Sequence, residues 1–425
     1  MKAEYETRYI DILKKELVPA LGCTEPIAVA YASAKATQVL GEFPDHINIS
    51  CSGNIIKNVK GVKVPNAGGL KGVGAAAVLG VVGGDADLEL EVLEHVKPEH
   101  IEQTKSLLEQ GFFSCKLVEN VENLYLVATV TAGVHSASVT IINRHTLITE
   151  IVKDGQVLYK ADSGRTTLTE KDSWEFSVKD ILEFAKTVSV EKIKPILEPQ
   201  IRLNTAIAEI GLAQKYGAQV GKTLLTCLDN SVYVRARARA AAGSDARMGG
   251  CSAPVVINSG SGNQGMTVSL PVIEYAKEWQ VSEECLYRAL AISNLISIHL
   301  KHYIGSLSAF CGAVTAAAGA SAAITYLAGG SYEQICSAIV NTIGSVGGMV
   351  CDGAKSSCAA KISSAVDAAI LAYDLSMQGH VFQPGEGLVL GDIESTIRSI
   401  GYVGRVGMKT TDVEILNIMI DNVTP

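Results

Sequence analysis

The feature that most constrains the fold is the segment 309–330, which carries no charged side chain. The segment is long enough to cross a bilayer. However, it consists mainly of Ala, Gly, Ser and Thr rather than Leu and Ile, and two histidines and a lysine precede it closely. We therefore expect a central helix that is buried by protein, and not a membrane-spanning helix.

The composition of the whole chain predicts a large buried core. Of the 425 residues, 48% are hydrophobic and 19% are charged, whereas an average soluble domain has roughly 25% charged residues. This balance indicates a thick helical core or an oligomer interface, and we expect a homodimer.

The net charge of −8 and the lack of a basic tract argue against nucleic acid as a partner. The N-terminal residues read as an amphipathic helix without the apolar core of a signal peptide, so we expect a cytoplasmic protein that does not bind membranes.

The amino-acid composition changes twice along the chain. These changes predict three parts, and the residue patterns within them predict an α+β fold. Residues 173–425 are largely helical and rich in Ala and Gly, and residues 1–85 would form the N-terminal part of the same main domain. Between them, 86–172 has an ordinary charged composition and would form an inserted small α+β domain with an antiparallel sheet. Alternating apolar residues predict strands at 45–51 and 88–96. We identify no catalytic constellation in the insert and interpret it as structural or regulatory.

The chain has ten cysteines. In a large chain without a signal peptide, they indicate reduced thiols, metal ligands or catalysis rather than disulfides. Three of them stand out, because Cys311 lies in the apolar segment, Cys351 in a glycine-rich loop and Cys358 at the start of a predicted helix. Their spacing differs from the CxxC pattern of zinc sites, although a Cys₃His zinc site with His299 or His302 is also possible. An iron–sulfur cluster is favoured, because three thiolates leave one iron open and a helix N-terminus would offset the cluster's negative charge.

A fourth cysteine, Cys23, lies in the run Gly-Cys-Thr-Glu-Pro just before a predicted helix. Pro26 suits the first turn of that helix. The dipole of a helix N-terminus stabilises a thiolate, so we predict a lowered pKa and a reactive Cys23. The alternative is a small buried residue beside a helix cap.

Two loops of small residues are candidates for binding a substrate carboxylate. The first, 64–72, contains Asn66 and Lys71. The second, 249–265, exposes backbone N–H groups and small hydroxyls that can approach an anion. A solvated lysine and a plain linker are the alternatives. The candidate residues of the second loop are Ser259, Ser261, Gly262, Asn263 and Gln264.

These motifs resemble the L-cysteine desulfidase family, which is similar to the alpha (catalytic) portion of bacterial iron–sulfur L-serine dehydratases. Residues 22–26 match the desulfidase signature, at the place where the dehydratases carry Ser-Ser-His-Thr-x-Gly-Pro. Further similarities cover Met248–Gly250 with Ala253-Pro254, Cys311–Gly319, Val346–Met349 and Cys358. The dehydratases place a cysteine before the Val-Gly-Gly run, whereas here Cys351 follows it, as in the desulfidases.

The resemblance implies a pyridoxal-independent lyase with a 4Fe–4S cluster on Cys311, Cys351 and Cys358 and one iron not ligated by cysteine. It further implies β-elimination of L-cysteine to sulfide, ammonia and pyruvate, with the Cys23 thiolate as general base. Three alternatives stay open. They are an L-serine or L-threonine dehydratase with the same cluster, a pyridoxal-phosphate dehydratase with a Ser-Gly-Asn loop at 261–263, and a non-catalytic zinc-stabilised metabolite-binding protein. The second of these lacks a convincing Schiff-base lysine upstream of the loop.

Overall fold

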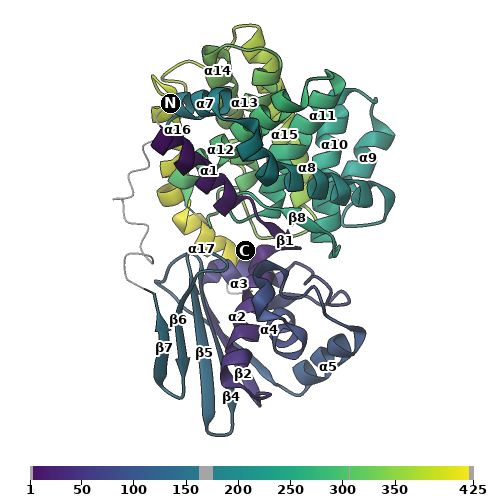
Figure 1. Cartoon of the computed structure of the whole chain (residues 1–425), viewed down its shortest axis with the longest axis vertical. Coiled ribbons are helices and arrows are strands. Elements are labelled where there is room, and N and C mark those ends of the chain that lie inside the picture. Colours follow the sequence, from purple (N-terminus) through teal and green to yellow (C-terminus); the bar gives the residue numbers. More distant parts are fainter. Residues whose placement is uncertain (1–2, 162–175, 306, 421–425) are drawn as a thin grey trace.

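A helical body forms one part of the structure, a computed structural model that describes residues 3–161, 176–305 and 307–420. In Figure 1 this body lies above a unit built on a β-sheet. Its helices are α1 (Ala3–Glu16), α7 (Val178–Thr187), α8 (Val190–Ala213), α9 (Val220–Cys227), α10 (Val232–Met248), α11 (Gly262–Glu278), α12 (Glu283–Ile304), α13 (Gly312–Leu327), α14 (Tyr332–Val346), α15 (Cys358–Met377) and α16 (Ile393–Tyr402). After α16, the π-helical segment η2 (Val403–Gly407) leads to α17 (Lys409–Met419).

The charge-free segment forms α13 at the centre of this body. Every residue from 313 to 325 is buried, and α13 packs against α11, α12, α14 and α15. The small side chains permit this packing, since a Cβ on Gly319 would lie 2.2 Å from the backbone oxygen of Ser293 on α12. The prediction of a central helix buried by protein is therefore confirmed. No helix in the described part of the chain is long and apolar enough to span a membrane.

The second part is a six-stranded sheet in which only β2 and β3 run parallel. In spatial order its strands are β3 (Phe113–Leu117), β2 (His46–Cys51), β4 (Tyr125–Ala132), β5 (His135–Ile142), β6 (Ile148–Lys153) and β7 (Gln156–Lys160). Alternate residues of β4 and β5 are buried, because one face of the sheet packs against helices. The helices of this unit are α2 (Thr24–Leu40), α3 (Gly53–Lys60), α4 (Gly72–Gly83), the 3₁₀ helix η1 (Ala86–Glu91) and α5 (Pro98–Glu109). A helical body with a separate mixed sheet confirms the α+β fold class.

The sheet unit differs from the expected insert in two ways. First, it extends into the N-terminal part of the chain, because β2 lies between β3 and β4, and α2 and α4 cover the sheet. The three-part division itself stays a prediction. Second, the strand predicted at 88–96 is wrong, since residues 86–91 form η1. Asp85 caps η1 by accepting a hydrogen bond from the Asp87 N–H, and this local interaction competes with the extended conformation.

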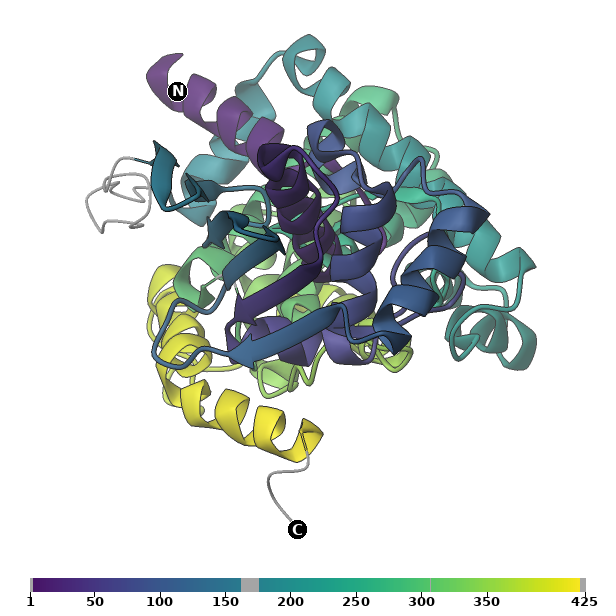
Figure 2. The same cartoon turned by 90° about the horizontal axis from the view of Figure 1, so that it is seen from below.

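Contacts between secondary-structure elements, among them a strand pairing and a helix packing, join the sheet unit to the helical body. Strand β1 (Pro19–Leu21) pairs antiparallel with β8 (Pro254–Val256), which brings the residues before α2 next to the loop before α11. On another side, α17 packs against α3, and Figure 2 shows α17 in yellow along one edge of the molecule. The start of α2 is therefore held between segments that are distant in the sequence.

Candidate functional site

Cys311 and Cys351 lie in two loops that run side by side. Phe310 and Val350 form an isolated antiparallel bridge. The Cys311 N–H donates to the Met349 oxygen at 3.0 Å, and the Cys351 N–H donates to the Ala309 oxygen at 2.6 Å. As expected, Cys358 is the first residue of α15. Cys311 proves to be the N-cap of α13 rather than a residue inside it, and its thiol makes no capping hydrogen bond.

The three thiols of this cysteine corner, Cys311, Cys351 and Cys358, are close enough to influence one another. Burial, together with negative charge on Cys351, raises the pKa of Cys311 to about 12. Burial also raises the pKa of Cys358, and charge on Cys351 adds to that effect. Without a cation, the Cys311 and Cys358 thiols therefore favour their protonated form, and a bound metal would be needed to hold them as thiolates.

The cysteine corner fits an iron–sulfur cluster by its donor chemistry. Three thiols from separate elements lie near one another, and three cysteine ligands would leave one iron of a cubane cluster without a cysteine ligand. Among the residues that the structure describes, no three Cys, His, Asp or Glu side chains are already arranged as a metal site. The thiols would therefore have to turn toward a common centre, and their role as ligands stays a prediction.

Lysines gather around the cysteine corner. Lys57 donates to the Cys351 oxygen at 3.5 Å and also pairs with Asp412. Lys361 donates to the Val350 oxygen at 2.8 Å. The lysines of this group are Lys57, Lys301, Lys355 and Lys361, and Asp352 pairs with the last two. The surroundings of the three thiols are thus suited to a negatively charged occupant.

Lys301 differs from the other three lysines, because its ammonium forms no hydrogen bond or ion pair in the described part of the chain. It lies in the last turn of α12 and is 8% exposed. Burial lowers the pKa of Lys301, whereas negative charge on Cys351 and Cys311 raises it. Since little of the Lys301 side chain reaches solvent, negative charge at the cysteine corner would stabilise its ammonium group.

A second corner lies at the N-terminus of α2, where Cys23 is the N-cap residue and is 2% exposed. Its thiol donates a hydrogen bond to Glu25 Oε2 at 3.0 Å. Asn58 Nδ2 donates to Glu25 Oε1 at 2.9 Å, and His145 Nε2 lies 3.9 Å from the same oxygen, which is an ion-pair distance. Cys23 belongs to a small buried cluster against which Cys358 packs, so the two corners are adjacent.

The lowered pKa predicted for Cys23 is wrong. Burial and the Glu25 carboxylate raise the pKa of Cys23 well above its ordinary value, and Arg247 offsets only part of this effect. Burial also raises the pKa of Glu25, but His145 and the hydrogen bond from Cys23 more than compensate and hold that pKa well below its usual range. The resting arrangement is therefore a thiol that donates to a carboxylate, because desolvation and a near charge outweigh the helix dipole.

The loop before α11 reaches toward both corners. The Thr24 hydroxyl donates to the Gly260 oxygen at 2.7 Å, next to Cys23. Further along, the Gln264 side chain accepts a hydrogen bond from Thr315 at 3.3 Å and lies where a Cβ on Gly312 would be. Since Gly312 follows Cys311, the loop connects the α2 corner with the cysteine corner.

The five loop candidates divide into two groups. Asn263 Oδ1 is buried without a hydrogen-bond partner in the described residues, so Asn263 and Gln264 retain polar groups that could bind a substrate. Ser261 is the N-cap of α11, and the Ser259 hydroxyl donates to Asn258 at 2.9 Å. Gly262 leaves space for the Arg247 side chain.

Asn66 and Lys71 are not joined to either corner by a hydrogen bond or ion pair in the described chain. Asn66 Nδ2 donates to the Leu93 oxygen at 2.8 Å. Lys71 is an exposed N-cap residue of α4. Their loop does approach the site, because a Cβ on Gly22 would lie 2.1 Å from the Pro65 ring. Their part in binding the substrate stays a prediction.

The sheet unit contributes His145, a residue that the sequence analysis missed. His145 lies in the turn between β5 and β6, and a Cβ on Gly260 would lie 3.0 Å from its ring. The insert was expected to hold no catalytic constellation. No local motif distinguishes this histidine, because its proximity to Glu25 depends on how the two parts of the fold meet.

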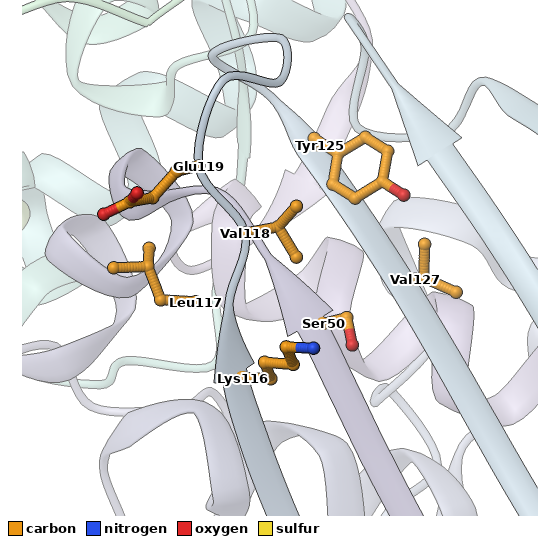
Figure 3. Close-up of a pocket in the computed structure, with 7 residues that line it drawn as sticks. All are labelled: Ser50, Lys116, Leu117, Val118, Glu119, Tyr125 and Val127. Atoms are coloured by element: carbon orange, nitrogen blue, oxygen red, sulfur yellow. The ribbon is translucent and has the colours of Figure 1, made fainter.

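A cavity in the sheet unit lies elsewhere (Figure 3). It has a volume of about 540 Å³ and is formed by β2, β3, the residues after β3, and β4. Its lining residues are Ser50, Lys116, Leu117, Val118, Glu119, Tyr125 and Val127. It contains none of the candidate cysteines and is separate from the site described above.

Comparisons with known proteins find one matching family model and relatives that are similar over the whole chain. Residues 87–417 match the family model described as serine dehydratase alpha chain. A UPF0597 protein of Lachnoclostridium phytofermentans is 53% identical over 97% of this chain and 99% of its own length. UPF0597 proteins of Desulfitobacterium hafniense (50% identical, over 98% of this chain and 97% of the relative) and Treponema denticola (47% identical, over 99% of both) are similar throughout. The family match contains the cysteine corner, whereas Cys23 lies outside it, in a part of the chain that these relatives do cover.

Proposed function

The chain belongs to the serine dehydratase alpha chain family, and from this membership we propose that it is a pyridoxal-independent iron–sulfur lyase acting on L-cysteine. The reaction is β-elimination, in which L-cysteine and water give pyruvate, ammonia and hydrogen sulfide. Cys311, Cys351 and Cys358 would hold a 4Fe–4S cluster with one iron not ligated by cysteine. When bound, such a cluster supplies a Lewis acid that makes sulfide a better leaving group.

The observation that supports this proposal most is the charge around the three thiols. Lys301 is buried and forms no pair in the described chain, and charge on Cys311 and Cys351 would stabilise it. A closed zinc site would need a fourth protein ligand. His299, one of the two candidates for that ligand, instead interacts with Glu394 at 2.7 Å. The surroundings therefore favour an anionic cluster over a zinc site.

The α2 corner supports proton transfer at the substrate α-carbon. Glu25 Oε2 already accepts the proton of Cys23 in a hydrogen bond. A transfer of that proton would leave Cys23 as the thiolate base, and the thiolate would then take the α-proton. The unpartnered Asn263 oxygen suits the ammonium group of an amino acid. The Lys301 ammonium and the Gln264 amide suit its carboxylate.

L-Serine or L-threonine dehydration with the same cluster is the second candidate. The family name favours it. Against it, residues 22–26 carry Cys23 where the dehydratases have a histidine. A direct comparison of L-cysteine, L-serine and L-threonine as substrates decides between the two reactions.

The test uses protein that is purified and reconstituted without oxygen. We expect iron and acid-labile sulfide to bind, and hydrogen sulfide to be released from L-cysteine faster than pyruvate forms from L-serine. Cys358→Ala should lose both iron and activity. Cys285→Ala is the matched control, because Cys285 lies in the first turn of α12, at the end away from Lys301. Full activity without iron, or a closed zinc site without turnover, would contradict the proposal.

A further inference from the structure

His145 is a group from the sheet unit that reaches a site otherwise built by α2 and the helical body. Its Nε2 is buried and has no hydrogen-bond partner in the described residues, and it lies 3.9 Å from Glu25 Oε1. The other oxygen of Glu25 accepts the Cys23 thiol at 3.0 Å. The Glu25 carboxylate therefore lies between the Cys23 thiol and the His145 imidazole.

We propose that Cys23, Glu25 and His145 form one proton-transfer chain, in which His145 is a positioning residue that orients Glu25 and takes up the proton released by Cys23. The inference rests on the proposed function, since it assigns how the base of that reaction loses its proton. It also gives the sheet unit a part in the chemistry.

The position of His145 is fixed by contacts on both sides of its turn. In the turn, Arg144 makes an ion pair with Glu16 of α1 at 3.5 Å, which ties it to the helical body. On the other side, Gly260 has a φ of 77° and no side chain, and the imidazole occupies the space beside it. The Thr24 hydroxyl donates to the oxygen of the same glycine, so the histidine, the loop and the start of α2 form one packed unit.

The chemistry explains why a third group is useful. Cys23 and Glu25 are both buried, so water cannot readily remove the thiol proton. Histidine is the side chain whose ordinary pKa lies nearest to neutrality, and it can accept a proton that a carboxylate gives up easily. Asn58 donates to Glu25 Oε1 at 2.9 Å and helps to keep the other oxygen directed at the thiol.

Protons and electrons balance over the whole elimination cycle. The S–H bond of Cys23 breaks, and its proton passes to Glu25 and then to His145. The Cys23 thiolate forms a new S–H bond with the α-proton of the substrate. The electron pair of the broken Cα–H bond forms the Cα=Cβ double bond, and the Cβ–S bond breaks with its pair on the leaving hydrosulfide. Cys23 then passes the proton that it took from Cα to the hydrosulfide, which becomes hydrogen sulfide. The proton held by His145 returns through Glu25 to the Cys23 thiolate, which restores the starting state.

The experiment compares His145→Gln with His135→Gln in the reconstituted holoenzyme. His135 is a matched control, because it is an exposed histidine of β5 that pairs with Asp154. We expect His145→Gln to lower kcat for sulfide release by about a hundredfold, with unchanged KM and iron content, and to alter the pH profile of kcat. A His145→Gly variant should regain activity with added imidazole. His135→Gln should behave like the wild type.

A second readout separates the inference from the proposed function. L-Alanine has no leaving group on its β-carbon, so exchange of its α-proton in D₂O reports proton abstraction alone. Sulfide release with equal kcat and pH profiles in both histidine variants would overturn the inference and leave the function intact. α-Proton exchange without sulfide release would overturn the function, and the exchange rate of His145→Gln would still decide the inference. A wild type that does neither would overturn both.

Discussion

The cysteine corner and the α2 corner place the same kind of side chain in opposite electrostatic surroundings. At the first, Cys311 and Cys358 lie at helix starts with lysines around them, and Lys301 lacks a partner in the described chain. At the second, Cys23 also lies at a helix start but donates to the Glu25 carboxylate. Burial raises the pKa of the thiols in both corners. The corners therefore differ in the groups beside the thiols, which are ammonium groups at the first and a carboxylate at the second.

The sharpest test of this comparison replaces one thiol in each corner. Cys351→Ala should lose iron and all activity, because a ligand is missing. Cys23→Ser should keep its iron but lose turnover by about 10²-fold to 10⁴-fold, because a hydroxyl is a poor base. Iron content and sulfide release measured side by side check both expectations. If Cys23→Ser lost its iron to the same extent, Cys23 would be a ligand and the comparison would fail.

A smaller effect is expected from Lys301→Met. Removing the ammonium should weaken retention of the cluster by about tenfold, as is typical when a group that supports the ligands is lost. The free energy of unfolding of the metal-free protein should instead rise by about 1 kcal/mol or more, because an unpaired buried charge is replaced by an apolar side chain. Iron release to a chelator and urea unfolding measure the two effects.

Lys277→Met is the control for this variant, since Lys277 is an exposed lysine of α11. Equal cluster retention in the two variants would show that Lys301 does not act on the cysteine corner.

The smallest effect concerns the ionisation of Cys23 in the metal-free protein. The Glu25 charge contributes to the raised pKa of Cys23, so Glu25→Gln should lower that pKa and increase the thiolate fraction at a given pH. The pH profile of Cys23 alkylation by iodoacetamide should move down by about half a unit to one unit, as followed by mass spectrometry of its peptide. Glu209→Gln, in an exposed ion pair of α8, is the control. An unchanged profile would mean that burial alone raises this pKa.

Features that depend on local sequence could be predicted. The lack of charge in 309–330 predicted the buried α13, and Pro26 correctly placed Cys23 at the start of a helix. The start of α15 at Cys358 was predicted in the same way. In each of these cases the local composition or the capping pattern is sufficient to predict the helix or its first residue, because few backbone conformations satisfy such a pattern.

Features that depend on distant neighbours could not be predicted. The strand predicted at 88–96 is a different case, because the Asp85 cap that favours η1 is a local interaction that competes with the alternating pattern. His145 gave no signal, because its proximity to Glu25 is created by the packing of the sheet unit on the helical body. The pKa of Cys23 was predicted to shift in the wrong direction. Glu25 is only two residues away in the sequence, but its orientation depends on Asn58 and His145.

The pairing of β1 with β8 also has a consequence for the order in which the site forms. Ala20 pairs with Val255, so the α2 corner requires closure of a very long loop, and contacts of this kind form slowly. The thiols of the cysteine corner are much closer together in the sequence and need only local closure. During refolding, the thiols for metal capture should therefore gather before the thiol, carboxylate and imidazole for proton transfer meet. The chain would then acquire the capacity to bind iron before it acquires the capacity to turn over a substrate.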